Sequence, residues 1–165
     1  MNRRSQKIIG INPGTRYLGI AVLDGSELLD WRIKVLEGKW SEKKIKKAIE
    51  ILSDIFDQYE PNVLVIKKLH PSRRSKSLAR LVVTIKALAR RKEMKVYQYS
   101  IKKVEDFFVE EGKLNKRNLA EAVISKYPVL SYELNKEKRN KNSYYIRAIE
   151  ATALAASYLQ EHESY

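Results

Sequence analysis

The segment IIGINPGTRYLGIAV, residues 8–22, decides how the start of this chain folds. Asn12-Pro13-Gly14 in its centre is a strong turn signal, and the Asp24-Gly25 pair that follows the segment is typical of a tight hairpin turn. Apolar runs flank both turns, as expected for strands. The expected strands are Lys7–Ile11, Tyr17–Leu23 and Leu28–Val35. Short connections join them, so they predict an antiparallel three-stranded meander.

The rest of the chain alternates between helical and strand patterns. Apolar residues at helical spacing predict helices, and the continuous apolar run Val63–Ile66 is typical of a strand buried on both faces. The expected helices are Ser41–Tyr59, Ser75–Lys92, a short one from Ser100 through Phe108, one from Asn115 to Pro128, and Ser143–Gln160. A fifth strand is expected at Lys95–Tyr99. This order predicts an α/β fold with a mixed sheet and helices on both sides.

The composition of the chain excludes several classes of protein and several kinds of site. The 165 residues suit a single domain, 1–165, and no apolar run approaches the ~18 residues of a membrane span. The chain contains no cysteine, which excludes disulfides, zinc–thiolate sites and thiol catalysis. Lys and Arg number 33 against 20 Asp and Glu, a net charge of +13. That excess favours a polyanionic partner, although a merely soluble basic surface has the same composition.

Most of the positive charge is concentrated in one segment. Residues 61–92 contain ten basic side chains and no acidic one, so they account for +10 of the +13. A second, smaller basic run follows at Lys136–Lys141. Clusters of this kind favour contacts with phosphate groups.

The opening segment, residues 8–22, resembles the first strand and turn of RuvC-type Holliday junction resolvases, which belong to the RNase H-like superfamily. The resemblance extends to the helix that ends at Tyr59-Glu60-Pro61, the strand Val63–Lys67, the basic helix after it and the alanine-rich segment 147–155. It implies an RNase H-like fold, in which an antiparallel three-strand meander and two parallel strands form a five-stranded mixed sheet flanked by helices.

The resemblance also implies a catalytic site, and this chain departs from it. Four carboxylates of that family hold divalent metal ions, which act on the attacking water and the leaving oxygen of a phosphodiester. The matching positions here are Asn12, Lys67, Arg147 and Glu150. Their formal charges are 0, +1, +1 and −1, which sum to +1 instead of −4. A cationic site repels Mg²⁺, so we expect no metal and no catalytic residue in this degenerate site.

The substituted residues suggest another use for the same place. We expect the Lys67 ammonium to face Glu150 in the former metal pocket, and Arg147 to face a phosphate; the alternative is that these positions simply drifted. Acidic residues elsewhere, Glu105 among them, are not expected to rebuild a site with Glu150. The candidate nucleic-acid-binding residues are Arg16, Lys68, Arg73, Arg74, Lys76, Arg80, Lys138, Arg139 and Arg147.

These observations predict a cytoplasmic, catalytically inactive homologue of a RuvC-type Holliday junction endonuclease. We expect its basic face to bind structured or branched DNA, and we expect no cofactor. One alternative is an active crossover junction endodeoxyribonuclease that uses Mg²⁺ or Mn²⁺ with relocated ligands. Another is a protein-interaction scaffold whose basic face binds an acidic protein. The resemblance implies a homodimer, but the helix that would pair is strongly basic, which opposes pairing.

Overall fold

The computed structural model describes residues 6–73, 75–108, 116–132 and 146–162. Asn115 and Ser143, the expected starts of two helices, lie outside these ranges. The elements, in chain order, are β1 (Lys7–Asn12), β2 (Tyr17–Asp24), β3 (Glu27–Val35), α1 (Glu42–Tyr59), β4 (Val63–Lys67), the 3-10 turn η1 (Pro71–Arg73), α2 (Lys76–Arg91), β5 (Lys95–Tyr99), α3 (Ile101–Phe108), α4 (Lys116–Lys126), the 3-10 turn η2 (Pro128–Leu130) and α6 (Ile146–His162).

The five strands form one mixed sheet in the order β3-β2-β1-β4-β5. β1 pairs with β2 and β2 with β3 in antiparallel fashion, whereas β4 runs parallel to β1 and β5 parallel to β4. This arrangement confirms the predicted meander with two further parallel strands. β1 and β4 are the inner parallel pair, so their carboxyl ends, at Asn12 and Lys67, lie side by side at one end of the sheet.

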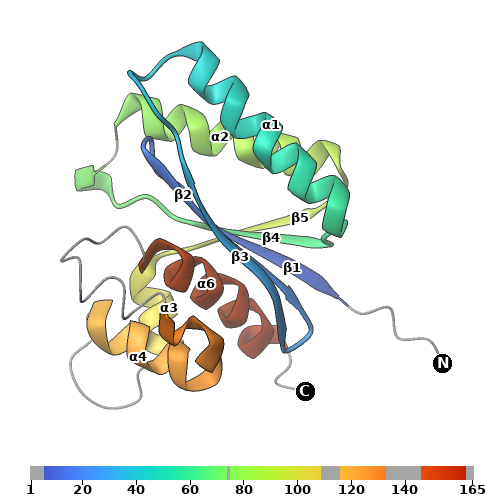
Figure 1. Ribbon diagram of the computed structural model, residues 1–165, viewed down its shortest axis with the longest axis vertical. Helices are drawn as coiled ribbons and strands as arrows, with labels where there is room; N and C mark the ends of the chain where they lie inside the picture. Colours follow the sequence, from blue (N-terminus) through green and yellow to red (C-terminus); the bar gives the residue numbers. More distant parts are fainter. Residues whose placement is uncertain (1–5, 74, 109–115, 133–145, 163–165) are drawn as a thin grey trace.

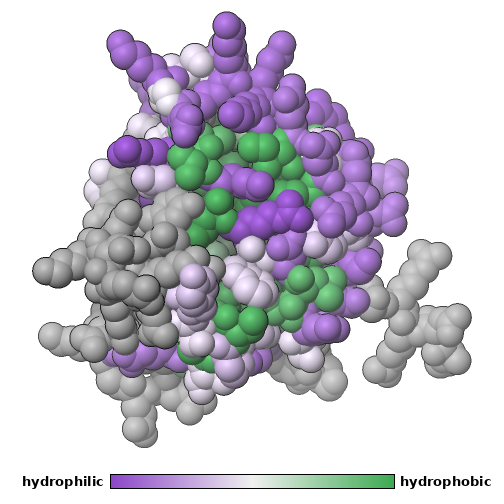
Figure 2. Space-filling view, viewed as in Figure 1, coloured by the Kyte–Doolittle hydropathy of each residue, from purple (hydrophilic) through white to green (hydrophobic). Residues whose placement is uncertain are grey.

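Helices cover both faces of the sheet, which gives the fold three layers (Figure 1). Helices α1 and α2 lie on one face, where Leu52 and Phe56 of α1 pack with Ile9 and Ile11 of β1. Helices α3, α4 and α6 lie on the other face. Each face therefore has its own apolar core. Hydrophilic side chains dominate the outer surface over α1 in the upper part of Figure 2.

The two long outer helices begin where the sequence places capping residues. The Ser41 side chain accepts a hydrogen bond from the backbone N–H of Lys44, and the Ser75 side chain accepts one from Leu78. These bonds satisfy backbone donors that the first turn of a helix leaves unpaired. Helix α1 ends at Tyr59, and the next residue, the C-cap Glu60, lies in the left-handed region with a φ of 49° and a ψ of 55°. Pro61 follows directly and prevents the helix from continuing.

Helix α6 packs unusually closely against the sheet because small residues meet there. A Cβ atom on Gly10 of β1 would lie 2.0 Å from the carbonyl oxygen of Ala151, and one on Gly19 of β2 would lie 2.3 Å from the carbonyl oxygen of Arg147. Both glycines therefore admit helix backbone where any side chain would collide with it. This contact fixes the start of α6 directly over β2.

No helix in the described ranges combines the length and the apolar character needed to cross a bilayer.

Candidate functional site

Three of the four positions that match the family's carboxylates, the substituted Asn12 and Lys67 and the retained Glu150, meet at the carboxyl ends of β1 and β4. Asn12 is the last residue of β1 and Lys67 the last residue of β4. Glu150 lies in the second turn of α6, the helix that packs across these strands. The side-chain nitrogen of Asn12 donates a hydrogen bond of 2.6 Å to Glu150 Oε2, and Lys67 Nζ lies 3.4 Å from the same oxygen. A carboxylate, an amide and an ammonium thus occupy one pocket.

The pocket is closed to solvent on the carboxylate side and open on the lysine side. Asn12 and Glu150 are each 3% exposed, while the Lys67 side chain is 24% exposed. The second carboxylate oxygen, Glu150 Oε1, is buried and has no hydrogen-bond partner among the described residues. A buried ion pair of this kind offsets its desolvation cost at best, so it gives little net stability. Its consequence is local: the ammonium neutralises the carboxylate from the side that faces solvent.

A second carboxylate, Glu105 of α3, interacts electrostatically with Glu150. Burial raises the pKa of Glu105 above its usual 4.5, and the charges of Glu150 and Asp106 raise it further, while Lys67 opposes them. Glu105 is itself buried. Strand β5 ends at Tyr99, which pairs with Lys67, so α3 starts at the same end of the sheet as the pocket.

Replacing Glu105 with glutamine is expected to stabilise the protein at neutral pH and to leave its stability unchanged near pH 3. The folded-state pKa lies above the unfolded one, so the folded form binds more protons in that window. Stability is therefore lost as pH rises from the unfolded pKa through the folded pKa, and a neutral amide removes the loss. Urea unfolding at the two pH values measures the difference.

The matched control is Asp106→Asn, which removes the same charge from the neighbouring exposed residue and is expected to change stability less at either pH. A gain from Glu105→Gln that is equal at both pH values would contradict an origin in ionisation.

Arg147, the third substituted position, lies over the turn between β1 and β2. Its guanidinium carbon is 5.5 Å from the centre of the Tyr17 ring, and its Nη1 would be 2.7 Å from a Cβ atom on Gly14. The guanidinium carbon of Arg16 lies 5.6 Å from the same ring. Two guanidinium groups therefore meet one aromatic ring at the rim of the pocket, where cation–π attraction holds them.

The remaining candidate binding residues are distributed unevenly. Lys68 and Lys76 are exposed near the same end of the sheet, as the residues after β4 and at the start of α2. Arg80 is also exposed, but it forms a two-pronged ion pair with Glu42 of α1, which reduces its free charge. The structure does not describe the side chains of four further candidates, Arg73, Arg74, Lys138 and Arg139.

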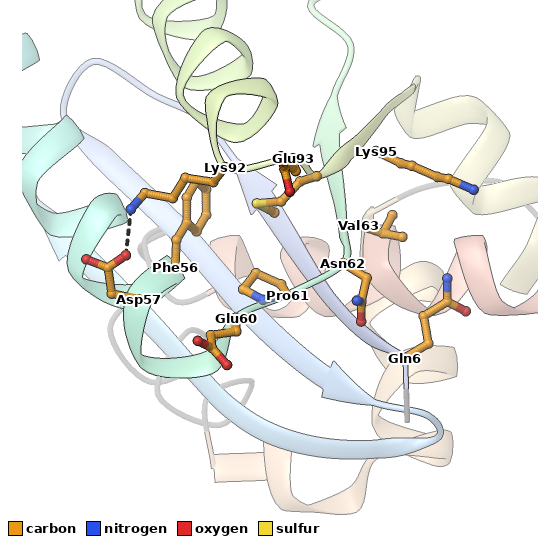
Figure 3. Close-up of a pocket in the computed structure, with 11 residues that line it drawn as sticks. Gln6, Phe56, Asp57, Glu60, Pro61, Asn62, Val63, Lys92, Glu93 and Lys95 are labelled. Carbon is orange, nitrogen blue, oxygen red and sulfur yellow. Dashed lines mark hydrogen bonds and ion pairs between the residues drawn. The ribbon is translucent and has the colours of Figure 1, made fainter. Parts of the chain in front are cut away.

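A separate hollow of about 750 Å³ lies at the opposite end of the sheet. Pro61, Asn62 and Val63 line it, and β4 runs from Val63 there to Lys67 at the substituted pocket. Figure 3 shows that its charged residues have both signs and that Lys92 pairs with Asp57, at 2.5 Å. This hollow is therefore distinct from the site that contains Asn12, Lys67 and Glu150.

Comparison with known proteins agrees with this architecture. The family described as crossover junction endodeoxyribonuclease RuvC matches residues 8–134. No curated protein matches the chain at the sequence level. Among solved structures, RuvC of Thermus thermophilus superposes with a TM-score of 0.74 at 16% identity, covering 94% of this chain and 96% of that one.

Two solved complexes are also similar in fold. T. thermophilus RuvC in complex with a Holliday junction substrate gives a TM-score of 0.70 at 17% identity and covers 95% of this chain and 96% of that one. The Fowlpox virus resolvase bound to its substrate Holliday junction DNA gives 0.58 at 16% identity and covers 93% of this chain and 99% of that one. The family match spans more than three quarters of the sequence, and its start coincides with β1. The chain belongs to the RuvC family of crossover junction endodeoxyribonucleases.

Proposed function

We propose that this protein binds structured or branched DNA at the end of the sheet that carries Asn12 and Lys67, and that it does so without metal-dependent cleavage. The similar solved structures of T. thermophilus RuvC and of the Fowlpox virus resolvase contain Holliday junction DNA, and this supports the choice of ligand. The chain's own basic side chains near the site support it independently, because phosphate contacts supply most of the affinity of proteins for DNA.

One observation carries the second half of the proposal: the ammonium of Lys67 lies on Glu150 Oε2, in the pocket where the resemblance places metal ions. The family normally uses divalent metals, and the residues present here do not fit them. Asn12 directs its amide donor, not its oxygen, toward the carboxylate. Within the described ranges, no three acidic, histidine or cysteine side chains group closely enough to hold a metal ion. A metal ion at this place would meet a fixed positive charge.

The positive charge available to DNA comes from side chains that the fold leaves unneutralised. Lys68 and Lys76 are exposed beside the pocket, and no ion pair is recorded for either within the described structure. Arg16 and Arg147 lie at the rim of the pocket. These four cationic residues come from the loop after β4, from α2, from α6 and from the β1–β2 turn, so they surround one end of the sheet. That arrangement suits a bent or branched phosphate backbone better than a straight one.

The proposal is tested with a labelled four-way junction and a duplex of the same length. We expect the junction to shift on a gel at low salt, to bind more tightly than the duplex, and to dissociate steeply as salt rises, because bound phosphates release counterions. We expect no cleavage after prolonged incubation with Mg²⁺ or Mn²⁺. Absence of any shift at low salt contradicts DNA binding, and metal-dependent nicking contradicts inactivity.

One observation favours a second candidate, a nuclease with relocated ligands: Glu105 supplies another carboxylate near Glu150. If the junction is nicked, a Glu150→Gln variant and a Glu105→Gln variant should each abolish the nicking. Cleavage that survives both substitutions contradicts this second candidate.

A further inference from the structure

We propose that Arg16 and Arg147 together hold one phosphodiester group of the DNA backbone in front of Tyr17. This inference rests on the proposed DNA binding and specifies where, and by what chemistry, the backbone is held. It also implies that binding requires no divalent cation.

The geometry brings the two guanidinium groups together from distant parts of the chain. Arg16 belongs to the turn between β1 and β2, and Arg147 is the second residue of α6. Their guanidinium carbons lie 5.6 Å and 5.5 Å from the centre of the same Tyr17 ring. The two groups therefore share one aromatic partner, and rotations of these long side chains can bring both to a single phosphate.

The position of Arg147 is held by its surroundings rather than by an acidic partner. A Cβ atom on Gly14 would lie 2.7 Å from Arg147 Nη1, so the guanidinium packs directly on the backbone of the turn. No ion pair is recorded for Arg147 or Arg16 among the described residues. Lys67, by contrast, is neutralised by Glu150. The uncompensated positive charge at the β1–β2 turn therefore belongs to the two arginines.

Local energetics oppose an arginine at this place unless it has a ligand. The first turn of a helix carries a partial positive charge, which favours acidic residues and disfavours basic ones. Helix α6 has no acidic residue in its first turn and has Arg147 there instead. Positions that break a local rule without compensation within the fold are commonly functional. Here the helix end and both arginines all favour the same kind of ligand, an anion.

The chemistry of the two side chains selects a phosphate group. A guanidinium presents two parallel N–H donors that match two oxygens of a phosphate, and its flat face stacks on an aromatic ring while its edge stays available. Tyr17 thus orders both arginines without consuming their donors. A phosphodiester offers two unesterified oxygens, and each can accept from both guanidinium groups.

The experiment measures junction binding by the variants Arg16→Ala, Arg147→Ala, their double mutant and Arg147→Lys, with and without EDTA. We expect each alanine variant to weaken binding about ten-fold, and the double mutant to lower the salt dependence by about one phosphate contact. Because both residues hold one phosphate, the double mutant should lose less than the product of the single losses. Lysine keeps the charge but not the paired donors, so it should restore only part of the affinity. EDTA should change nothing.

The matched control is Arg91→Ala, which removes the same charge from an exposed position at the far end of α2. Circular dichroism and the melting temperature verify that each variant folds, and Arg16 is exposed, so its substitution leaves the core intact. If the wild-type protein binds the junction while Arg16→Ala and Arg147→Ala behave like Arg91→Ala, or if EDTA abolishes binding, this inference is wrong and the proposed DNA binding stands. If the wild-type protein does not bind at all, both fail together.

Discussion

Gly10→Ala is expected to destabilise the protein by more than about 3 kcal/mol, a large part of the ~5–15 kcal/mol that holds a domain folded. The new methyl carbon would lie 2.0 Å from the carbonyl oxygen of Ala151 and 3.1 Å from the backbone nitrogen of Ala155. Both neighbours are helix backbone, so no side-chain rotation relieves the collision. Helix α6 would have to move off the sheet and expose the core that it shares with β1, β2 and β4. Urea unfolding followed by circular dichroism measures the loss.

Gly25→Ala provides the control, because it adds the same methyl group where nothing lies within 4 Å. Gly25 has a φ of +56°, so alanine pays only the cost of a left-handed conformation, about 1–2 kcal/mol. The difference between the two variants isolates the steric cost of the close approach of α6. Equal losses would mean that α6 does not lie as near to β1 as the structure places it.

The meander and the helices after it could be predicted from the sequence, because turns and helix caps depend on residues close together in the chain. The Asn12-Pro13-Gly14 and Asp24-Gly25 turns set the meander, and Ser41 and Ser75 cap the helices that follow. Turn chemistry, capping and periodicity act within a few residues, so a pattern in the chain predicts them. The antiparallel meander was therefore predicted correctly, and so was the mixed five-stranded sheet with the two parallel strands that the resemblance implied.

The candidate site could be predicted only in part from the sequence, because the surroundings of Glu105 and Arg147 depend on packing between distant elements. Glu105 looks like an ordinary residue of a short amphipathic helix, and only the pairing of Tyr99 with Lys67 reveals that this helix starts beside the pocket. The approach of Arg147 to Tyr17 requires the glycines that let α6 reach β2. Periodicity contains no information on such contacts.

The charge that the basic segment 61–92 offers to a ligand also depends on contacts between distant elements, which the sequence does not show. In the sequence, no acidic residue lies among its ten basic ones. In the fold, α1 lies beside α2 and supplies Glu42 to Arg80 and Asp57 to Lys92. Two of the ten charges are thus neutralised by the preceding helix, and Lys67 is neutralised by Glu150. Counting charge along a chain therefore overestimates the charge that a surface offers to DNA.

Restoring acidic side chains at the three substituted positions is expected to create a divalent cation site. The combined variant Asn12→Asp, Lys67→Glu, Arg147→Asp changes the formal charge of the four positions from +1 to −4. Carboxylates are the ligands that Mg²⁺ and Mn²⁺ prefer, and the retained Glu150 already lies beside two of the three positions. Without metal, four carboxylates repel one another, so the variant should be less stable than the wild type.

Mn²⁺ should reverse that loss, because a ligand that binds only the folded state stabilises it. At a hundred times its dissociation constant, an ion adds about 2.7 kcal/mol, which raises the melting temperature of a chain of this size by about 5–10 °C. Melting curves with increasing Mn²⁺ and isothermal titration calorimetry both measure the effect. The wild-type protein, with the Lys67 ammonium in place, should show no such rise.

A control variant with the same change in net charge tests whether stabilisation by Mn²⁺ depends on where the carboxylates lie. This control carries Lys47→Glu, Arg90→Asp and Gln98→Glu at exposed, scattered positions. Its net charge changes by the same amount as that of the restored variant. This control should respond to Mn²⁺ no more than the wild type does, because dispersed carboxylates are screened from one another and bind the ion weakly. If the wild type is stabilised as strongly as the restored variant, then Lys67 does not exclude metal from this pocket, and the reason for proposing inactivity is lost.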